Sequence, residues 1–515
     1  MKTVSICVTS DVHGHIMPTN YRNNQEEQLG LAKAATILKK IREKNHTILI
    51  DNGDFIQGSP FTYYFAKKQA DQPSPMIKVA NQLNYDLAVI GNHEFNYGLP
   101  YLQEAVEASD FPWLSANIVD NSTNQPFLGK PYIIKETAGI RIAILGLTTH
   151  YIPNWEDPNH IKNLTFDDAV KTAKKWVAKI RETEVPDVMV VSYHGGLERD
   201  PKTGEPTEEL TGENQGYQIC QEVEGIDICI TGHQHRYLTE KINGVTVVQP
   251  GNNGQAIAEI KVEFDQTIQS VTSTLHRLDE QTEVDREVEY SIREEERQVQ
   301  AFLDQTITTV KGDMEIRDPM KVRLHGHPFI NYINQLQMDV AEADISCTAL
   351  FHDLSPGFPQ QITMRDIVSN YIYPNTLKVL KLTGQDIKDA LEKSASFFQV
   401  ENNQIEINPA YLKPKPQPYN YDMWQGIYYK VKLSNPIGER VIRLEYQGEP
   451  LDLNQEFQVV MNNYRASGGG DYYMFKNKEV VKDIPIDMTE LITDDLLKRD
   501  ELVPDQTSYF RIIAQ

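Results

Sequence analysis

Seven side chains that can bind divalent metal ions follow five apolar segments of the sequence, at the point where each segment ends. The clearest example is the apolar run 86–90, which is followed by Gly91, Asn92, His93 and Glu94. Side chains at the carboxyl ends of parallel strands face the crevice where open α/β sheets bind ligands. Each residue alone has another explanation, because a histidine can lie in a turn and an aspartate can cap a helix. The repetition favours one shared site, and its predicted metal ligands are Asp11, His13, Asp54, Asn92, His194, His233 and His235.

This set of ligands suits two divalent cations that share one bridging carboxylate. Imidazole nitrogens bind transition metals well, and oxygen donors bind harder ions. Two cations about 3.5–4 Å apart hold a phosphate between them and lower the pKa of a bridging water, which gives a nucleophile near neutral pH. The predicted cofactors are therefore two divalent metal ions, drawn from Mn, Zn, Fe, Co, Mg and Ca, and the predicted reaction is hydrolysis of a phosphate ester.

His93 adjoins the predicted ligand Asn92, so its ring can point at the phosphate while Asn92 points at the metal. It can donate a proton to the leaving alkoxide or hold the phosphoryl charge in the transition state. His15 is of the same residue type, but we expect it to be a loop histidine that supports the site without binding metal.

The elements that must position these residues alternate between strand and helix. Apolar runs at 4–9, 47–50, 86–90, 140–147, 188–191 and 226–230 have the character of buried strands, and 31–44, 76–83 and 166–182 have helical spacing. This alternation predicts one sheet that is parallel at its centre, with helices on its faces. Strands at 244–248 and 257–264 are expected to close the domain. The fold class is α/β with α+β character.

A chain of 515 residues is too long for one core, so we expect two domains. Residues 1–275 form the catalytic domain, and the highly charged segment 276–305 is predicted to be a solvated linker helix. Residues 306–515 form the second domain, with helices at 329–341 and 384–397 and strands at 377–382 and 455–461. The proline-rich stretch 413–418 predicts an extended surface loop.

The composition limits the partners of this protein. A net charge of −23 argues against a nucleic-acid polymer, because such binding needs clustered Lys and Arg, whereas a small phosphorylated substrate can bind through metal ions. The sequence indicates no membrane span and no obligatory protein partner. Its start runs straight into a motif, so we expect the cytoplasm. Four scattered cysteines, in apolar contexts, are predicted to be buried free thiols.

The order of the motifs resembles the calcineurin-like metallophosphoesterases, and the two-domain layout resembles their 5'-nucleotidase family. The matching residues are Asp11-x-His13, Gly53-Asp54, Gly91-Asn92-His93-Glu94, His194 and Gly232-His233-x-His235. The resemblance implies a phosphoesterase sandwich with mixed sheets, a linker helix and a C-terminal α/β nucleotide-binding domain. It also implies His93 as the catalytic histidine, and it divides the ligands into Asp11, His13, Asp54 and His235 at one metal and Asp54, Asn92, His194 and His233 at the other.

Within that family the sequence is similar to the 2',3'-cyclic-nucleotide 2'-phosphodiesterase/3'-nucleotidase branch. The similar segments are 51–60, 371–377, 419–422 and 462–471. By this resemblance two aromatic rings clamp the nucleobase, Tyr464 with either Tyr419 or Tyr421, and stacking of this kind tolerates many bases. The expected substrate-binding residues are Tyr464, Tyr419, Tyr421, Gly468, Gly469 and Asp471.

Two departures from the 5'-nucleotidases bear on mechanism and substrate. Asn96 stands where those enzymes carry an aspartate, so the carboxylate partner of His93 is missing from that position. A neutral amide can only orient the ring, which predicts His93 as a neutral donor to a phosphoryl oxygen unless another carboxylate, with Glu94 as a candidate, takes the place of the aspartate. The segment 348–353 also lacks the Gly-Gly-x-Arg run of those enzymes.

Three functions fit these observations. The leading one is a metallophosphoesterase that acts on 2',3'-cyclic nucleotides or 3'-nucleotides. A second is a 5'-nucleotidase or nucleotide-sugar hydrolase, which the same metal site would serve. A third, of another class, is a nucleotide- or metabolite-binding module without turnover; the intact ligand set argues against it.

Overall fold

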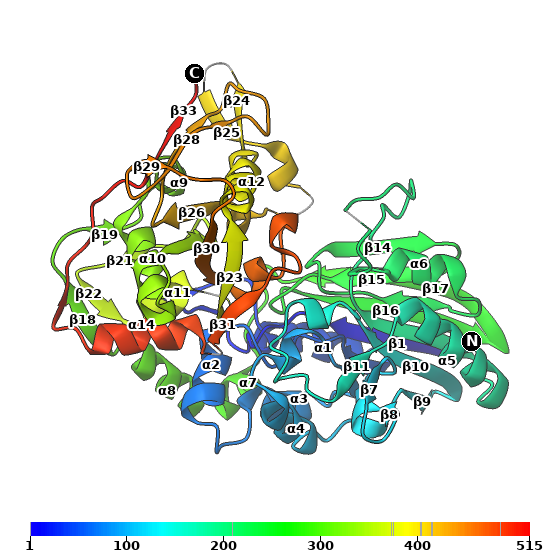
Figure 1. The fold of residues 1–515 in the computed structure, drawn as a ribbon. Coiled ribbons are helices and arrows are strands. Elements are labelled where there is room, and N and C mark those ends of the chain that lie inside the picture. The colour runs from blue at the N-terminus through cyan, green and yellow to red at the C-terminus, as the bar shows by residue number, and fades with distance from the viewer. Residues whose placement is uncertain are drawn as a thin grey trace. The chain divides into compact units, whose positions relative to one another are not determined.

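The computed structural model describes residues 2–208, 210–371, 373, 375–401, 404–413, 416–484 and 486–515. The chain divides into two compact units, Met1–Gln300 and Ala301–Gln515, coloured blue to green and green to red in Figure 1. The division falls inside the segment 276–305 that the sequence predicts to be a linker.

The first unit contains two six-stranded mixed sheets, each parallel at its centre. The second sheet is antiparallel at both edges, whereas the first is antiparallel only at the edge formed by its last two strands along the chain. The strand–helix alternation alone predicts one such sheet and is corrected to two, whereas the sandwich with mixed sheets that the family resemblance implies is confirmed. The first sheet has the order β17 (Thr267–Arg277), β16 (Ala256–Asp265), β1 (Lys2–Thr9), β4 (His46–Asp51), β5 (Leu87–Val89) and β6 (Trp113–Leu114). The second has the order β14 (Tyr237–Ile242), β15 (Val245–Pro250), β13 (Ile228–Ile230), β12 (Val188–His194), β10 (Ile140–Thr148) and β9 (Tyr132–Thr137).

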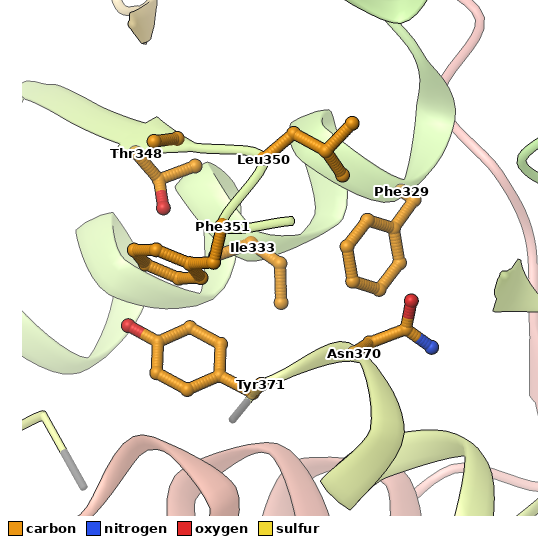
Figure 2. Close-up of a pocket in the computed structure, with 8 residues that line it drawn as sticks. Phe329, Ile333, Thr348, Leu350, Phe351, Asn370 and Tyr371 are labelled. Atoms are coloured by element: carbon orange, nitrogen blue, oxygen red, sulfur yellow. The ribbon is translucent and has the colours of Figure 1, made fainter. Parts of the chain in front are cut away.

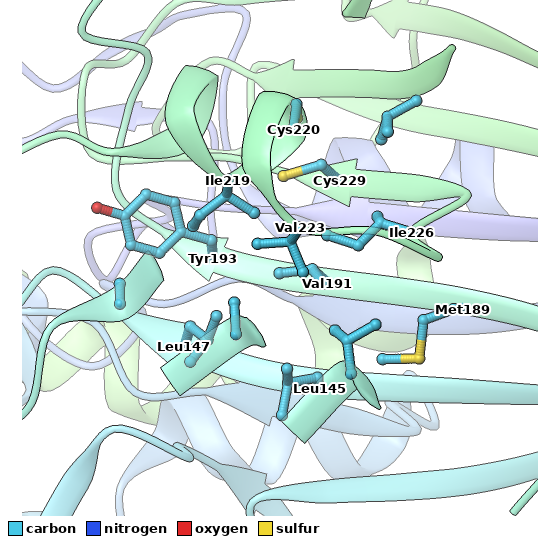
Figure 3. Close-up of a cluster of buried hydrophobic side chains, with 14 of the residues drawn as sticks. Leu145, Leu147, Met189, Val191, Tyr193, Ile219, Cys220, Val223, Ile226 and Cys229 are labelled. Atoms are coloured by element: carbon cyan, nitrogen blue, oxygen red, sulfur yellow. The ribbon is translucent and has the colours of Figure 1, made fainter. Parts of the chain in front are cut away.

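Strand β10 shows how the two sheets share a core, because apolar side chains cover both of its faces. Ile142 and Ile144 join a buried cluster with Ile6 and Ile50 of the other sheet. The alternate residues, such as Leu145, lie in a second cluster beneath helices of the unit (Figure 3). Strands buried on both faces read as continuous apolar runs, which is why the sequence shows no alternation here.

Helices cover the outer faces of these sheets. Helices predicted at 31–44, 76–83 and 166–182 are confirmed as α1 (Leu31–Arg42), α3 (Pro75–Gln82) and α5 (Ala169–Thr183). The remaining elements of the unit are α2 (Pro60–Lys68), α4 (Leu99–Glu107), α6 (Gly216–Glu222), β2 (Thr19–Asn20), β3 (Gln25–Glu26), β7 (Ile118–Asp120), β8 (Gln125–Pro126), β11 (Leu164–Phe166), and the 3₁₀ turns η1 (His93–Phe95), η2 (Phe127–Gly129) and η3 (Ile152–Asn154).

The predicted linker helix is two short helices, α7 (Arg286–Ser291) and α8 (Arg293–Leu303). Ile292 interrupts them, with φ −116° and ψ 12°. Acidic residues of this segment pair with lysines of the first unit: Lys39 Nζ lies 2.6 Å from an Asp285 oxygen, and Lys78 Nζ lies 2.5 Å from a Glu295 oxygen. The charged segment therefore contacts the first unit as well as solvent.

The second unit is built on a mixed five-stranded sheet of order β26 (Asp422–Gln425), β20 (Ile345–Ala349), β30 (Glu456–Asn462), β23 (Leu377–Thr383) and β31 (Val480–Ile484). A four-stranded sheet has the order β29 (Glu449–Pro450), β28 (Val441–Tyr446), β27 (Tyr428–Lys432) and β33 (Phe510–Ile513). A three-stranded sheet has the order β22 (Gln361–Thr363), β18 (Thr306–Val310) and β32 (Glu501–Leu502). Two-stranded pairs are β19 (Met314–Glu315) with β21 (Gly357–Phe358) and β24 (Phe398–Glu401) with β25 (Gln404–Ile407).

The helices predicted at 329–341 and 384–397 are confirmed as α10 (Pro328–Ala341) and α12 (Gly384–Ala395). The other helical elements of this unit are α9 (Pro319–His325), α11 (Met364–Asn370), α13 (Asn463–Ala466), α14 (Met488–Leu497), η4 (Pro409–Tyr411), η5 (Pro418–Asn420) and η6 (Tyr473–Phe475). Pro414 and Lys415 of the predicted proline-rich loop lie outside the described residues, as do Ile372 and Pro374 of segment 371–377.

All four cysteines are buried and free, as the sequence predicts. Two of them, Cys220 of α6 and Cys229 of β13, lie in the apolar cluster of Figure 3. Among the described residues, none of the helices combines the length and the apolar character that a membrane crossing requires.

Candidate dimetal site

The predicted metal ligands come together in the first unit from the carboxyl ends of strands in both sheets. Asp11 and His13 follow β1, and Asp54 follows β4. His194 is the last residue of β12 in the opposite sheet. The remaining three ligands follow β5 and β13 and are Asn92, His233 and His235.

Five of the seven ligands have a positive φ, which is uncommon for residues other than glycine. The values are 54° for Asp11, 50° for His13, 57° for Asp54, 66° for His233 and 57° for His235. Such backbone costs on the order of 1–3 kcal/mol per residue and collects at functional sites, where the surrounding structure holds it. The strained turns aim the side chains at one point.

The first candidate metal cluster consists of Asp11, His13 and His235, whose ligand atoms all lie within 4.8 Å of one another. Nε2 of His13 lies 3.1 Å from Nε2 of His235, which in turn lies 3.5 Å from Oδ1 of Asp11. The other ring nitrogen of His13, Nδ1, lies 3.1 Å from the backbone oxygen of Gln57, to which its N–H donates. Nε2 of the neutral ring is then unprotonated and free to bind a cation.

The second cluster consists of Asp54, His194 and His233. Nδ1–H of His194 donates to the backbone oxygen of Asn52 at 2.7 Å. Its Nε2 faces Oδ2 of Asp54 at 3.1 Å and Oδ1 of Asn92 at 3.0 Å. Three acceptor atoms therefore point at one another, an arrangement that needs a cation or a proton between them.

Asp54 belongs to the second cluster and also faces the first. Its Oδ2 is 3.1 Å from Nε2 of His194 and 4.0 Å from Nε2 of His13. Its Oδ1 accepts a hydrogen bond from the backbone N–H of His93 at 2.8 Å. Gly91 permits this approach, because a Cβ there would lie 2.4 Å from Oδ1 of Asp54. The donor set thus fits two divalent cations with Asp54 as the shared carboxylate.

Burial and charge set the protonation of these ligands. Burial lowers the pKa of His13 to about 3, which keeps the ring neutral as a metal ligand requires. Burial also favours the neutral form of His194, but the charge of Asp54 outweighs it and raises the pKa of His194 to about 10. The charge of Asp54 thus favours the protonated form of His194, and a metal ion bound between them would compete with that proton.

Glu94 has a structural role and is not the partner of His93. Its carboxylate accepts backbone N–H groups from Gly91 at 2.6 Å, Asp54 at 2.9 Å and Phe55 at 2.6 Å. These bonds join the loop that carries Asn92 to the loop that carries Asp54. The suggestion that Glu94 replaces the missing aspartate is wrong, because its oxygens are engaged with these backbone groups.

His93 lies beside the first cluster, with its ring centroid 5.3 Å from that of His13 in an edge-to-face arrangement. Its Nδ1 lies 2.6 Å from Oδ1 of Asn96, the residue that replaces the aspartate. His15 belongs to neither cluster; its Nδ1 lies 3.2 Å from the backbone oxygen of Val12.

Two residues that the sequence analysis missed hold the ligand His233. Its Nε2 lies 2.8 Å from Oε1 of Glu213, and its Nδ1 lies 2.9 Å from Oδ1 of Asn92. The indole of Trp155 stacks on its ring at 5.4 Å between centroids and 24° between planes. Glu213 and Trp155 come from loops without periodic pattern or motif, so no signal in the sequence marks them.

The predicted nucleobase residues lie in the second unit. The rings of Tyr419 and Tyr464 lie 6.2 Å apart and nearly perpendicular, at 81°. Both are partly exposed, so a clamp of these two tyrosines stays a prediction that requires the rings to turn parallel. Tyr421 is corrected to a core residue: it is 2% exposed, packs on Phe398 and donates its hydroxyl to the backbone oxygen of Arg323.

The glycine segment beside Tyr464 makes close contacts with protein atoms. A Cβ on Gly469 would lie 2.6 Å from the ring of Tyr464, so only a glycine leaves room for the ring in this position. Gly468 is buried with φ +89°. Asp471 is exposed, and its carboxylate lies 3.3 Å from Nζ of Lys393.

Arg465, which the sequence analysis also missed, ties these segments together. Its buried guanidinium pairs with Asp422 at 2.7 Å and donates to the backbone oxygens of Tyr419, at 2.7 Å, and Gly469. The sequence did contain a signal for Arg465, because this residue lies inside segment 462–471, which resembles the family branch.

Segment 348–353, where the 5'-nucleotidases carry their Gly-Gly-x-Arg run, forms part of an apolar pocket. Leu350 and Phe351 line it together with Phe329 and Tyr371 (Figure 2). Arg323 of α9 reaches this segment instead, with Nη2 2.7 Å from a carboxylate oxygen of Asp353.

Comparison with known proteins shows which family this chain is similar to. Residues 4–237 match the family model "Calcineurin-like phosphoesterase", and residues 306–477 match "5'-nucleotidase, C-terminal domain". A solved Staphylococcus aureus structure, assigned as a 5'-nucleotidase and in complex with alpha-ketoglutarate, is 36% identical with a TM-score of 0.91; the match covers 99% of this chain and 100% of that one. The chain belongs to the 5'-nucleotidase family of calcineurin-like phosphoesterases. The predicted family, fold class and pair of divalent cofactors are thereby confirmed.

Two curated relatives within this family span most of the chain. The 2',3'-cyclic-nucleotide 2'-phosphodiesterase/3'-nucleotidase of Yersinia enterocolitica is 29% identical over 90% of this chain and 80% of its own length. The trifunctional nucleotide phosphoesterase protein YfkN of Bacillus subtilis is 27% identical over 97% of this chain, which spans only 38% of YfkN.

Proposed function

We propose that this family member hydrolyses phosphate esters of nucleotides, with 2',3'-cyclic nucleotides and 3'-nucleotides as its main substrates. The observation that carries the reaction class is the convergence of two ligand clusters on Asp54, with His93 beside them. The similarity to the Yersinia enterocolitica enzyme, over most of both chains, supports the choice of substrate. Asn96, in place of the aspartate of the 5'-nucleotidases, supports the same branch.

The residues of the first unit have distinct parts in this reaction. When bound, the two cations polarise the phosphate and lower the pKa of a water that attacks phosphorus. Asp54 would be the carboxylate that both ions share, and the imidazoles of His13, His194 and His233 would offer them unprotonated nitrogens. His93 can pass a proton to the leaving oxygen as its bond to phosphorus breaks.

The proposed role of the second unit is to bind the nucleoside. Tyr419 and Tyr464 are partly exposed aromatic residues on segments that Arg465 holds together. A base stacked on such rings contributes on the order of 1–3 kcal/mol and leaves base identity open. Tyr464 and Tyr419 are therefore the proposed clamp, without Tyr421.

A panel of nucleotides tests this proposal. The purified full chain, loaded with Mn²⁺, is assayed for hydrolysis of 2',3'-cyclic AMP, for cleavage of a UDP-sugar to UMP, and for phosphate release from 3'-AMP and 5'-AMP. We expect the cyclic nucleotide and 3'-AMP to give the highest kcat/KM. Binding of all four compounds without turnover would instead identify a binding module.

The second candidate function is 5'-nucleotidase activity, which the similarity to the Staphylococcus aureus protein favours. A kcat/KM for 5'-AMP above that for 3'-AMP in the same panel would support it. Equal release of the 3'- and 5'-phosphates would indicate a broad nucleotidase.

The cytoplasmic location stays a prediction, supported by the four free, buried thiols. Fractionation of cells into cytoplasmic and surface fractions, with an antibody against this chain, tests it.

A further inference from the structure

His93 is connected to a buried carboxylate through the side chain of Asn96. Nδ1 of His93 lies 2.6 Å from Oδ1 of Asn96, and Nδ2 of Asn96 donates to Oε2 of Glu156 at 2.6 Å. Glu156 follows turn η3, and its side chain is only 6% exposed. The 5'-nucleotidases carry an aspartate in place of Asn96. In this chain the carboxylate of Glu156 reaches His93 indirectly, through the side-chain amide of Asn96.

The other oxygen of Glu156 is also engaged, which holds the carboxylate in place. Oε1 accepts the backbone N–H of Asp157 at 2.9 Å and lies 2.9 Å from Nδ1 of His160. The backbone N–H of Glu156 donates to the oxygen of Ile152 at 3.0 Å. The carboxylate therefore has a defined orientation.

These contacts determine the direction of each hydrogen bond. An ionised carboxylate only accepts, so the NH₂ group of Asn96 must face Glu156 and its oxygen must face His93. An amide oxygen also only accepts, so Nδ1 of His93 must carry a hydrogen. In the neutral ring Nε2 is then unprotonated.

We propose that Glu156 is a positioning residue for His93, which acts through the amide of Asn96 to hold the ring as its Nδ1–H tautomer. Asn96 and Glu156 together take the place of the single aspartate. The proposal differs from the expectation of a neutral donor, because a neutral ring with its hydrogen on Nδ1 has none on Nε2.

This arrangement suits the donation of a proton by His93. That role rests on the proposed hydrolysis of phosphate esters. As the water oxygen bonds to phosphorus and the bond from phosphorus to the leaving oxygen breaks, a proton carried on Nε2 of His93 moves to that oxygen. The ring left behind is the Nδ1–H tautomer, whose remaining hydrogen already points at Asn96. Solvent water then returns a proton to Nε2.

Exchange of the amide and the carboxylate tests the pairing. In N96D two carboxylate oxygens would meet at the 2.6 Å now occupied by a hydrogen bond, and in E156Q the amide of Asn96 loses its fixed direction. In the double variant N96D/E156Q, the introduced amide donates to the introduced carboxylate, which still accepts from Nδ1 of His93. Asp157→Asn is the matched control, because it removes a charge from the same loop without touching Asn96.

Phenyl phosphate and p-nitrophenyl phosphate, with Mn²⁺, are the probes, since neither contains a nucleoside. Phenoxide is the stronger base and needs a proton from the enzyme more. We expect each single variant to lower kcat for phenyl phosphate by about 10–100-fold, with a smaller loss on p-nitrophenyl phosphate and unchanged KM and metal content. The double variant should recover to within about threefold of the parent, a non-additive result.

Unchanged kcat in a folded E156Q protein, or a double variant no better than the worse single one, would overturn the inference. A second readout does not depend on turnover: ¹⁵N-histidine NMR of the Zn²⁺-loaded protein, with His93→Gln for assignment. We expect the hydrogen on Nδ1 in the parent and a mixture of tautomers in E156Q. An Nε2–H tautomer in the parent would contradict the positioning role, whereas a parent inactive on both esters would contradict the proposed function alone.

Discussion

Oε1 of Glu213 lies 2.8 Å from Nε2 of the metal-binding candidate His233, on the side of the ring away from Asn92. A carboxylate in this position fixes the ring tautomer and makes the other nitrogen a stronger ligand. Trp155 stacked on the same ring restricts its rotation. His233 is therefore oriented for metal binding by two loops at once.

Loss of this carboxylate should weaken the second metal site. We expect Glu213→Ala to lower the affinity for Zn²⁺ by about 10–100-fold at one of two sites, measured by calorimetric titration of the metal-free protein. Glu213→Gln, which can still accept through its amide oxygen, should lose less. Glu205→Ala in the same loop, at an exposed position, is the control. Equal affinity in Glu213→Ala and the control would show that Glu213 does not act on His233.

Asp54 should be the most sensitive of the ligands, because it lies within reach of both clusters. We expect Asp54→Asn to reduce the bound metal to less than one ion per chain and to abolish turnover, whereas His235→Ala should retain one ion. Elemental analysis of the purified variants measures this. Full metal content in Asp54→Asn would disprove the bridging role.

Glu94 should matter for stability, because its carboxylate accepts several buried backbone N–H groups. Glu94→Gln replaces one acceptor oxygen with an NH₂ group that faces those donors. The expected loss in free energy of unfolding is about 1–3 kcal/mol, from denaturant titration of the metal-free chain. Glu107→Gln, at an exposed position of α4, should change it little. A loss as small as that of the control would contradict this role.

Tyr464 should affect nucleotides more than small esters, if it stacks on the base. We expect Tyr464→Ala to lower kcat/KM for 3'-AMP by roughly 5–100-fold and to leave p-nitrophenyl phosphate nearly unchanged. Tyr290→Ala, an exposed tyrosine of the first unit, controls for removal of a surface ring. Equal losses on both substrates would assign Tyr464 to the fold instead.

The pKa of His160 should lie above the ordinary value of a histidine. The hydrogen bond to Glu156 raises its pKa, Asp157 adds to this effect, and burial and Lys67 oppose it. A raised pKa means that the contribution of this pair to stability is present at low pH and is lost as the pH rises through the folded-state pKa. In an NMR titration, Glu156→Gln should lower the pKa of His160. An unchanged value would show that the hydrogen bond is absent in solution.

The candidate metal ligands could be picked out from the sequence because each depends on a local signal. A fully apolar strand that ends in Gly-Asn-His or Gly-Asp marks its own carboxyl end, and parallel strands bring such ends to one edge. The helices at 31–44 and 384–397 were predictable for a similar reason, since apolar spacing within one element suffices. The count of sheets did not follow from the alternation of strands and helices, because strands buried on both faces carry no information about which neighbour they pair with.

The sequence by itself therefore determined the family, the two-metal chemistry and the candidate ligands that the structure brings together. Only the tertiary structure decided how those residues are held. Glu213, Trp155 and Glu156 lie in loops without periodicity, and each acts on a residue far away in the chain. The same holds for Tyr421, which shares its sequence segment with Tyr419 yet is buried. Contacts of this kind depend on which loops the paired strands bring together, and no local pattern records that.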